Sequence, residues 1–248
     1  MDQATTNMGE VLVYDYYGWK VSDSDPGPAD WKKQGKDLTT EGDEELLRVI
    51  NTDVLSNKRT ALEIGVNYGF GIPLLSKHFN HVHTFDFPND IFQCFQANMQ
   101  ERNINNLTIH PYGLGAENMQ VANIDRFRRK GFNRGALANS VVDDQTQLRE
   151  GEDQYISQKK FEVKTLDSLE IKDVDLVIID TEGYEVNVLQ GAIETIKRYS
   201  PVLVVEFSAK QLSKYNYTIQ KLEKFLIELG YQHHNNLNAV DRVYVCKV

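Results

Sequence analysis

A glycine-rich segment near residue 65 has the composition of a ligand-binding turn. Residues 63–71 have the sequence EIGVNYGFG and join a short apolar run to a segment with helical periodicity. Glycines let the backbone bend tightly and let a ligand approach the amides at a helix N-terminus. About twenty residues further on, Asp86 ends the next apolar run, where a carboxylate can accept hydrogen bonds from both hydroxyls of a ribose. Together these features predict a site for an adenosine-type cofactor.

The side chains of the turn narrow the choice of cofactor. A dinucleotide fingerprint starting at Gly65 would need glycine at positions 67 and 70, but Asn67 and Phe70 stand there. The second glycine of that fingerprint admits a pyrophosphate, so Asn67 weighs against NAD or FAD. Glu63 is poorly placed for a diphosphate and well placed for the ammonium of a methionine moiety. The pattern favours S-adenosylmethionine; the alternative is an ordinary strand-to-helix turn with Glu63 as a surface acid.

The elements that would position this turn alternate along the chain. Strands are predicted over residues 60–65, 81–86, 107–112, 174–180 and 202–207, and helices over 72–79, 89–102, 186–199 and 219–229. This alternation is typical of a parallel sheet covered on both faces. An antiparallel pair, residues 231–234 with 242–248, is predicted to complete an α/β fold.

The first 55 residues have a different pattern. Residues 11–21 alternate aliphatic and aromatic side chains with a bend near Gly18, which predicts a strand or hairpin. Residues 22–30 are predicted to form a loop, because two prolines and a glycine lie among polar residues. Thr40 is predicted to cap the following helix. We expect residues 1–55 to be an extension packed on a domain of residues 56–248, with its aromatic residues serving in packing or in a homo-oligomer surface.

Composition excludes several classes of protein. The chain has 248 residues, of which 41% are hydrophobic and 25% charged, and this composition is typical of a globular protein. Its formal net charge of −9 argues against nucleic acid as a partner. No apolar run approaches the ~20 residues that span a bilayer, so no membrane association is expected. Two cysteines and a polar start over residues 1–9 favour the reducing cytoplasm.

Several segments resemble the FkbM family of S-adenosylmethionine-dependent methyltransferases. The resemblance covers about residues 60–208 and is carried by TALEIGVNYGFG, HTFDFPND, NMQERNINNLTIHPYGLG, TLDSL, VDLVIIDTEGYEVNVLQGA and PVLVVEF. Its most specific part is the acid-x-Glu-Gly-x-Glu segment at residues 180–185, together with the glutamate that ends the next strand, Glu206. The resemblance implies the Rossmann-like class I methyltransferase sheet, with seven strands and the last one antiparallel.

The resemblance also implies a set of cofactor-binding residues: Glu63, Gly65, Asn67, Tyr68, Gly69, Asp86, Phe87, Tyr112, Gly113 and Asp180. Two positions depart from the family pattern. The family usually has Glu-Pro after the second strand, whereas Phe87 here separates Asp86 from Pro88, and we still assign Asp86 to the ribose. Many class I enzymes bind the adenine amine with an acid or asparagine after the third strand. Here that stretch is HPYG, so we expect backbone groups to hold the adenine edge.

The acids Asp180, Glu182 and Glu206 are the candidate catalytic residues. Methyl transfer to a hydroxyl needs an aligned acceptor and a group that removes its proton. Three acids converging at one sheet edge would repel, which can raise the pKa of one of them and create a base. A helix N-terminal acid is the structural alternative for Glu182. Such acids could also bind a divalent cation, but no metal site is predicted from them.

The stretch between residues 115 and 161 shows no sustained period, so we interpret residues 116–160 as a lid or insertion. This stretch contains a cluster of basic residues, followed by an asparagine and a serine. We predict that these side chains contact an anionic acceptor: Arg126, Arg128, Arg129, Arg134, Asn139 and Ser140. A solvated basic loop offset by nearby acids is the alternative.

These observations predict an S-adenosylmethionine-dependent O-methyltransferase acting on a saccharide or another polar metabolite. The acceptor would be a small molecule or glycan. The alternatives are a methyltransferase acting on nucleic acid or protein, and a non-catalytic protein that binds the same cofactor.

Overall fold

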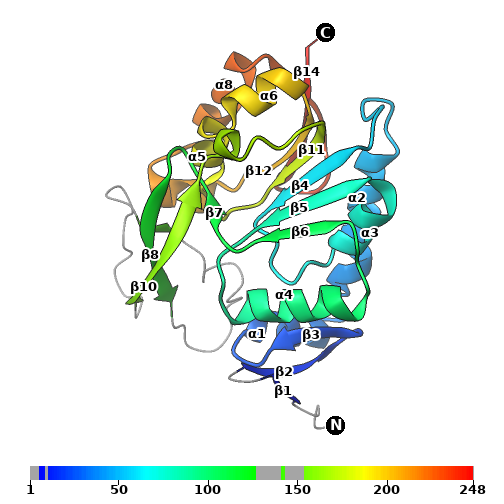
Figure 1. Ribbon diagram of the computed structural model, residues 1–248, viewed down its shortest axis with the longest axis vertical. Coiled ribbons are helices and arrows are strands. Elements are labelled where there is room, and N and C mark those ends of the chain that lie inside the picture. Colours follow the sequence, from blue (N-terminus) through cyan, green and yellow to red (C-terminus); the bar gives the residue numbers. More distant parts are fainter. Residues whose placement is uncertain (1–5, 9–10, 127–140, 143–153, 248) are drawn as a thin grey trace.

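The computed structural model describes residues 6–8, 11–126, 141–142 and 154–247. Its main sheet has the strand order β13-β14-β12-β11-β4-β5-β6 (Figure 1). Their bounds are β4 Thr60–Ile64, β5 His81–Phe85, β6 Leu107–His110, β11 Val174–Ile179, β12 Val202–Glu206, β13 Tyr231–Asn236 and β14 Asp241–Cys246. β14 runs antiparallel to β12, while β4, β5, β6, β11 and β12 are mutually parallel. The predicted seven-stranded sheet with its antiparallel last strand is confirmed.

Helices cover both faces of this sheet, because its central strands are apolar on both sides. One face packs against α2 Leu38–Ile50, α3 Ile72–His78 and α4 Asp90–Glu101. The other packs against α5 Glu185–Gln190, α6 Ile193–Tyr199 and α8 Ile219–Glu228. The two sets of helices are visible on either side of the sheet in Figure 1. The sheet is therefore the middle layer of three.

The N-terminal segment forms a second, antiparallel sheet. Its strands are β1 Thr6–Met8, β2 Val11–Tyr16 and β3 Trp19–Ser22, so the predicted hairpin is confirmed. The buried Asn98 of α4 anchors β3: its Oδ1 accepts from the Lys20 amide at 2.8 Å, and its Nδ2 donates to the Lys20 carbonyl at 3.0 Å. Arg102 lies over the Trp19 ring, 3.6 Å from its centroid. These contacts hold the extension beside α4 (Figure 1).

Helix boundaries in this region differ from the prediction. Part of the predicted loop 22–30 belongs to helix α1, Pro26–Lys33, whose N-cap Asp25 accepts from the Gly27 amide at 2.9 Å. The helix tolerates its prolines because they lie in the first turn, where the backbone N–H has no intrahelical partner. Helix α2 begins at Leu38 under the N-cap Asp37, not under Thr40. An aspartate placed before each helix therefore sets both starts.

The predicted helix 186–199 is divided into α5 and α6. The division follows from a close backbone contact, because a Cβ at Gly191 would lie 1.9 Å from the carbonyl oxygen of Gly115. Helical periodicity continues through the break, so the pattern alone does not reveal it.

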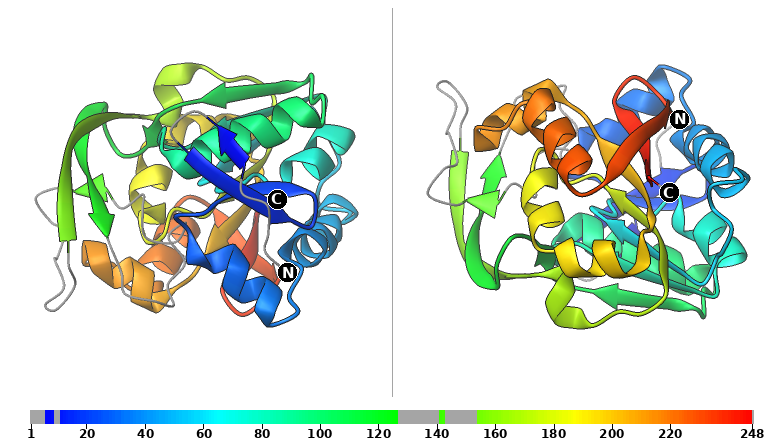
Figure 2. Two further views of the ribbon diagram at one scale, coloured as in Figure 1. Left: turned by 90° about the horizontal axis from the view of Figure 1, so that it is seen from below. Right: turned by 90° about the horizontal axis from the view of Figure 1, so that it is seen from above.

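The predicted insertion contains strands that the sequence pattern did not indicate. A third sheet, ordered β7-β10-β8-β9, is formed by β7 Gly113–Leu114, β8 Met119–Arg126, β9 Val141–Val142 and β10 Gln154–Lys164. It stands at one side of the molecule in both orientations of Figure 2. Phe161 of β10 packs on Phe87, with 5.2 Å between ring centroids. Among the predicted acceptor-binding residues, Arg126 ends β8, and Arg128, Arg129, Arg134, Asn139 and Ser140 lie outside the described residues. The lid remains a prediction.

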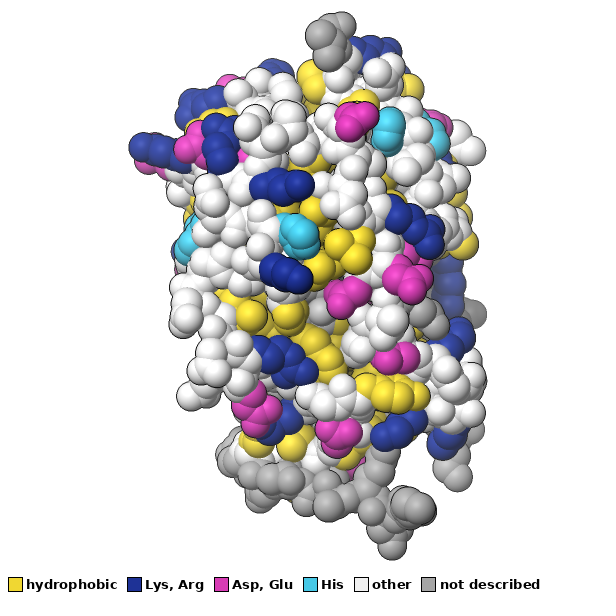
Figure 3. All heavy atoms as spheres, turned by 90° about the vertical axis from the view of Figure 1, so that its right-hand side faces the viewer, with side chains coloured by type: hydrophobic (Ala, Val, Ile, Leu, Met, Phe, Trp, Pro, Cys, Tyr) yellow, Lys and Arg dark blue, Asp and Glu magenta, His cyan; other side chains and the backbone are white. Residues whose placement is uncertain are grey.

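The described helices and one face of the surface bear on possible partners. None of these helices combines the length and apolar character needed to cross a bilayer. On the face shown in Figure 3, basic and acidic side chains are interspersed, and that face has no continuous basic area.

The close approach of β4 to β11 gives a test of the fold. A Cβ at Gly65 would lie 1.7 Å from the Asp180 carbonyl oxygen, whereas nothing lies within 4 Å of one at Gly230. The φ angles of the two glycines are nearly equal, +87° and +90°. We expect Gly230→Ala to cost about 1–2 kcal/mol in unfolding free energy from backbone strain alone. Gly65→Ala should cost clearly more, because backbone must move. Urea unfolding measures both, and equal losses would contradict the steric constraint.

Candidate cofactor and active site

A pocket opens where strands β4, β5 and β11 end. Seven of the residues predicted for the site line it: Gly65, Asn67, Asp86, Phe87, Gly113, Asp180 and Glu182. Glu63, Tyr68, Gly69, Tyr112 and Glu206 are not part of the lining. Phe85, Ile91, Leu114 and Tyr184 supply apolar surface. All charged side chains among the described lining residues are acidic, namely those of Asp86, Asp180 and Glu182.

The glycine turn is held by Asp86. Its Oδ2 accepts from the amides of Val66 at 3.1 Å and Asn67 at 3.2 Å, and its Oδ1 accepts from the Phe87 amide at 2.7 Å. Burial raises the pKa of Asp86 to about 6, and these amides act against that rise. Asn67 has a left-handed φ of +50°, a conformation that asparagine adopts more readily than most residues. Asp86 therefore connects the end of β5 to the turn that follows β4.

Glu63 lies behind the turn. The residue is partly buried, and its Oε2 is buried with no hydrogen-bond partner among the described residues. A Cβ at Gly71, just before α3, would be 3.9 Å from this oxygen. Burial raises the pKa of Glu63 to about 8, and the nearby charge of Asp86 adds to the rise. An unpaired carboxyl of this kind fits a cationic partner better than a phosphate.

Three further residues predicted to bind the cofactor have structural contacts instead of a place in the lining. The buried Tyr68 donates from its hydroxyl to Asp25 Oδ2 at 2.9 Å, which ties the turn to the start of α1. A Cβ at Gly69 would lie 2.5 Å from the Phe95 ring of α4. Tyr112 has its hydroxyl 2.9 Å from His110 Nδ1. Its neighbour Gly113 does line the pocket, where it packs against Phe87.

The three candidate catalytic acids come together at the ends of β11 and β12. Asp180 is exposed to the pocket, and its amide donates to the Ile64 carbonyl at 3.0 Å. Surrounding protein desolvates its carboxyl and raises its pKa well above the ordinary value, and Glu206 and Glu182 add repulsion. Burial, followed by repulsion from Glu185, raises the pKa of Glu206 to about 8. The Oε2 of Glu206 is buried and has no hydrogen-bond partner in the described part of the chain. The predicted convergence of carboxyl groups is present.

The turn at residues 180–185 owes its shape to Glu185. This fully buried side chain accepts at Oε1 from the Thr181 amide at 3.1 Å and the Gly183 amide at 2.9 Å. Gly183 has φ +109°, and a Cβ there would lie 2.2 Å from the Gln211 carbonyl oxygen. The last glutamate and the glycine of the acid-x-Glu-Gly-x-Glu segment are thus explained by backbone geometry. They place Glu182 at the pocket.

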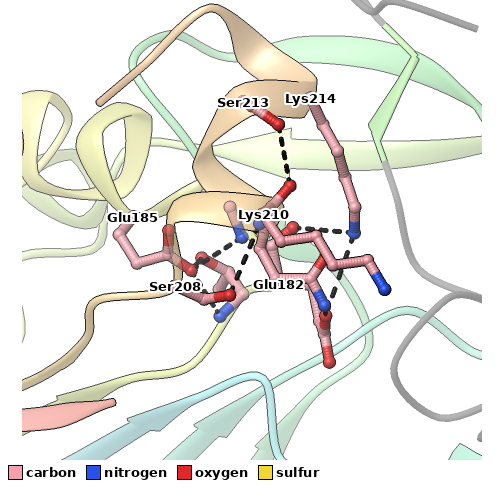
Figure 4. Close-up of polar contacts among 9 residues, drawn as sticks. Glu182, Glu185, Ser208, Lys210, Ser213 and Lys214 are labelled. Carbon is pink, nitrogen blue, oxygen red and sulfur yellow. Dashed lines mark hydrogen bonds and ion pairs between the residues drawn. The ribbon is translucent and has the colours of Figure 1, made fainter. Parts of the chain in front are cut away.

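Two residues that the sequence analysis missed contact Glu182. Gln211 of α7 Ala209–Leu212 donates from Nε2 to Glu182 Oε2. Lys214, in the 3-10 helix η2 Ser213–Tyr215, donates from Nζ to the Glu182 carbonyl at 3.1 Å and lies 3.8 Å from Glu182 Oε2 (Figure 4). Both residues lie in the polar stretch SAKQLSKYNY, which has no local signal for a buried contact. Their role follows from the packing of this segment over the turn.

A metal centre was not predicted. Within the residues that the structure describes, no group of three or more His, Cys, Asp and Glu side chains could hold a metal ion.

If the seven strands of the main sheet are numbered 1 to 7 along the chain, from β4 to β14, their order across the sheet is 3-2-1-4-5-7-6 and strand 7 is antiparallel. This order, together with the pocket at the strand ends, defines a class I methyltransferase fold. A family model described as "Methyltransferase FkbM domain" matches residues 63–233. The chain therefore belongs to the FkbM family of S-adenosylmethionine-dependent methyltransferases, as the resemblance over residues 60–208 implied. No curated protein matches the chain.

A solved structure shares this fold at low sequence identity, and two others are less similar. An FkbM methyltransferase from Methylobacillus flagellatus KT has a TM-score of 0.51 and 16% identity, over 76% of this chain and 43% of that one. The chain thus spans less than half of that relative. For a methyltransferase from Aquifex aeolicus the TM-score is 0.45 and the sequence identity 14%, over 88% of this chain and 97% of that one. For M. jannaschii TYW2, solved in complex with AdoMet, the TM-score is 0.43 and the sequence identity 12%, over 98% of this chain and 89% of that one.

The raised pKa of Glu63 predicts a pH-dependent stability. Its ordinary value is 4.5 and its folded value about 8, so the folded state binds the proton more tightly. The resulting stability is present at low pH and is lost as the pH rises from about 4.5 through 8. We expect Glu63→Gln to raise the Tm by a few degrees at pH 9 and to change it little at pH 5.

Thermal unfolding at the two pH values measures the effect. Glu44→Gln, at an exposed position of α2, is the matched control and should change neither Tm. An equal change in Tm at both pH values for Glu63→Gln would show that the carboxyl does not titrate as described.

Proposed function

We propose that this protein transfers a methyl group from S-adenosylmethionine to a hydroxyl of a saccharide or another polar metabolite. The observation that carries the proposal is the charge of the pocket. Its described lining offers Asp86, Asp180 and Glu182 and no lysine or arginine. Such a pocket disfavours a pyrophosphate and favours a ligand that carries positive charge on a sulfonium and an ammonium.

The residues present fit this cofactor. Asp86 lines the pocket at the end of β5 and would accept from the ribose through the lone pairs that the turn amides leave, while Glu63, outside the lining, would supply a negative charge behind the turn for the ammonium. Phe87 and Gly113 also line the pocket and would offer an aromatic ring and a backbone without a side chain to the adenine. The bound cofactor would supply an electrophilic methyl group on a positively charged sulfur.

The acids at the ends of β11 and β12 supply the base. A hydroxyl is a weak nucleophile at neutral pH, so a nearby carboxylate that takes its proton accelerates its attack on the methyl carbon. Asp180 and Glu182 line the pocket, and burial raises the pKa of both carboxyls, that of Glu182 to about 7. Glu206 does not line the pocket and would act through Asp180, whose pKa it raises. Asp180 or Glu182 would accept the proton of the acceptor hydroxyl as its oxygen took the methyl group that the bound cofactor would supply, with S-adenosylhomocysteine as the other product.

The basic segment that suggested an anionic acceptor lies almost wholly outside the described residues, so that expectation stays a prediction. A polyanion such as nucleic acid is disfavoured by the acidic lining and by the net charge of −9. The cytoplasm remains the expected location.

The proposal predicts separate roles for two aspartates. Asp86→Ala should weaken binding of S-adenosylhomocysteine at least tenfold, because it removes the ribose acceptor and releases the amides of the turn. Asp180→Ala should abolish methyl transfer and largely spare that binding. Titration calorimetry measures binding, and a tritiated-methyl screen over hydroxylated metabolites and glycans measures transfer.

Asp53→Ala, at an exposed position, is the control and should change neither quantity. Equal loss of binding in the Asp86 and Asp180 variants would overturn this division of roles. Binding without transfer to any acceptor tested, including RNA and protein, would favour the non-catalytic alternative.

A further inference from the structure

We propose that Lys214 is a positioning residue that holds Glu182 at the pocket and compensates its charge. The proposal rests on the proposed function only for the part that Glu182 plays in proton transfer. Lys214 does not line the pocket, so it would act on the reaction through Glu182 and not by touching the acceptor.

The first argument is the burial of the lysine. Its side chain is 1% exposed, and that of Glu182 is 22% exposed. A buried ammonium is costly unless it is paired and hydrogen-bonded. Lys214 Nζ lies 3.8 Å from Glu182 Oε2 and donates to the Glu182 carbonyl at 3.1 Å. Figure 4 shows the side chain extending from η2 to this residue. The ammonium therefore binds both the side chain and the backbone of Glu182.

The second argument is the shape of the turn. Glu182 has a left-handed φ of +56°, an uncommon conformation for a glutamate. Lys214 holds its carbonyl, while Gln211 and Lys214 both approach Oε2. Both of these side-chain contacts are made by one carboxyl oxygen, Oε2, while the residue lines the pocket. Segment 211–214 thus determines which way the carboxyl faces.

The third argument is the balance of charges around Glu182. It is faced by Asp180 from the end of β11, Glu185 from α5, Glu206 from β12, Lys210 from α7 and Lys214 from η2. Burial raises the pKa of Glu182 to about 7, the charge of Glu185 adds to the rise, and Lys214 is the strongest influence that lowers it. Lys210 acts in the same direction more weakly and is exposed. Loss of Lys214 would leave the carboxyl largely protonated and unable to accept a proton.

Carbon-13 NMR of the full chain labelled at glutamate side-chain carboxyls tests this without a known acceptor. The Glu182 signal is identified by its loss in Glu182→Gln. We expect the midpoint of the Glu182 titration curve, near pH 7, to rise by at least one pH unit in Lys214→Met, which is a tenfold fall in acidity. The reason is that the variant lacks the ammonium that stabilises the ionised carboxylate. Lys214→Arg keeps a positive charge and should restore most of the original inflection. Lys210→Met is the matched control, with a smaller shift.

An unchanged inflection in Lys214→Met, or an equal shift in Lys210→Met, would overturn the proposal. A second measurement does not require a Lys214 variant to fold. In Glu182→Gln, the carbon-13 signal of the Lys214 side chain should show its ammonium losing the proton at least one pH unit lower than in the natural chain. No change there would also overturn the pairing.

The two proposals fail separately. If Glu182→Gln retains full methyl transfer once an acceptor is found, the base assigned to Glu182 is wrong, while the NMR titration still decides the pairing. If both proposals hold, Lys214→Met should shift the acid limb of the plot of kcat against pH to higher pH. The affinity for S-adenosylhomocysteine should stay within twofold.

Discussion

Several carboxyl groups lie together at the edge where β11 and β12 end. Holding them there has an electrostatic cost, and the rest of the site must offset it. Burial is the first cause of the raised pKa of Asp180, Glu182, Glu185 and Glu206, and repulsion between them adds to it for all but Glu185. Each of these groups would be better solvated on the surface. Perturbed carboxyls gathered in a cleft are a feature of functional sites, because chemistry near neutral pH needs groups that titrate there. The fold supports this arrangement through backbone amides and a few buried partners.

The topology of the sheet brings these groups together from distant parts of the chain. β4 lies between β5 and β11, and Ile64 is paired with Phe85 on one side and Ile179 on the other. The residue that follows each of these three is a component of the site: Gly65, Asp86 and Asp180. Any side chain at Gly65 would meet the Asp180 backbone, so the glycine is needed for the fold as much as for the ligand. One register therefore sets the positions of both the glycine turn and Asp180.

Much of this arrangement could be predicted from local sequence. Buried strands such as VDLVII have a strong pattern, and residues that directly follow parallel strands must meet at one edge. Contacts made by irregular segments could not be predicted. Lys214 lies in a polar stretch and becomes buried only because η2 packs over the turn at Gly183. Strands β8 and β10 were missed because their sequences lack a sustained alternation. The polar, proline-containing pattern around Pro26 and Pro28 predicts a loop, although a preceding aspartate can make such prolines the first turn of a helix.

The acidic pocket also suits the charge balance of the proposed reaction. Before transfer, a positively charged sulfur would face a carboxylate, so the pair is neutral overall. After the proposed transfer, the carboxylate would hold the acceptor proton and the product would carry no charge on sulfur. A neutral pair thus exists on both sides of the reaction, which matters where charges are poorly solvated. A lysine in the lining would disturb this balance, whereas Lys214 lies outside the lining and against Glu182. The position of the cation, outside the pocket and against the turn, is consistent with a role in setting the base and not in binding the acceptor.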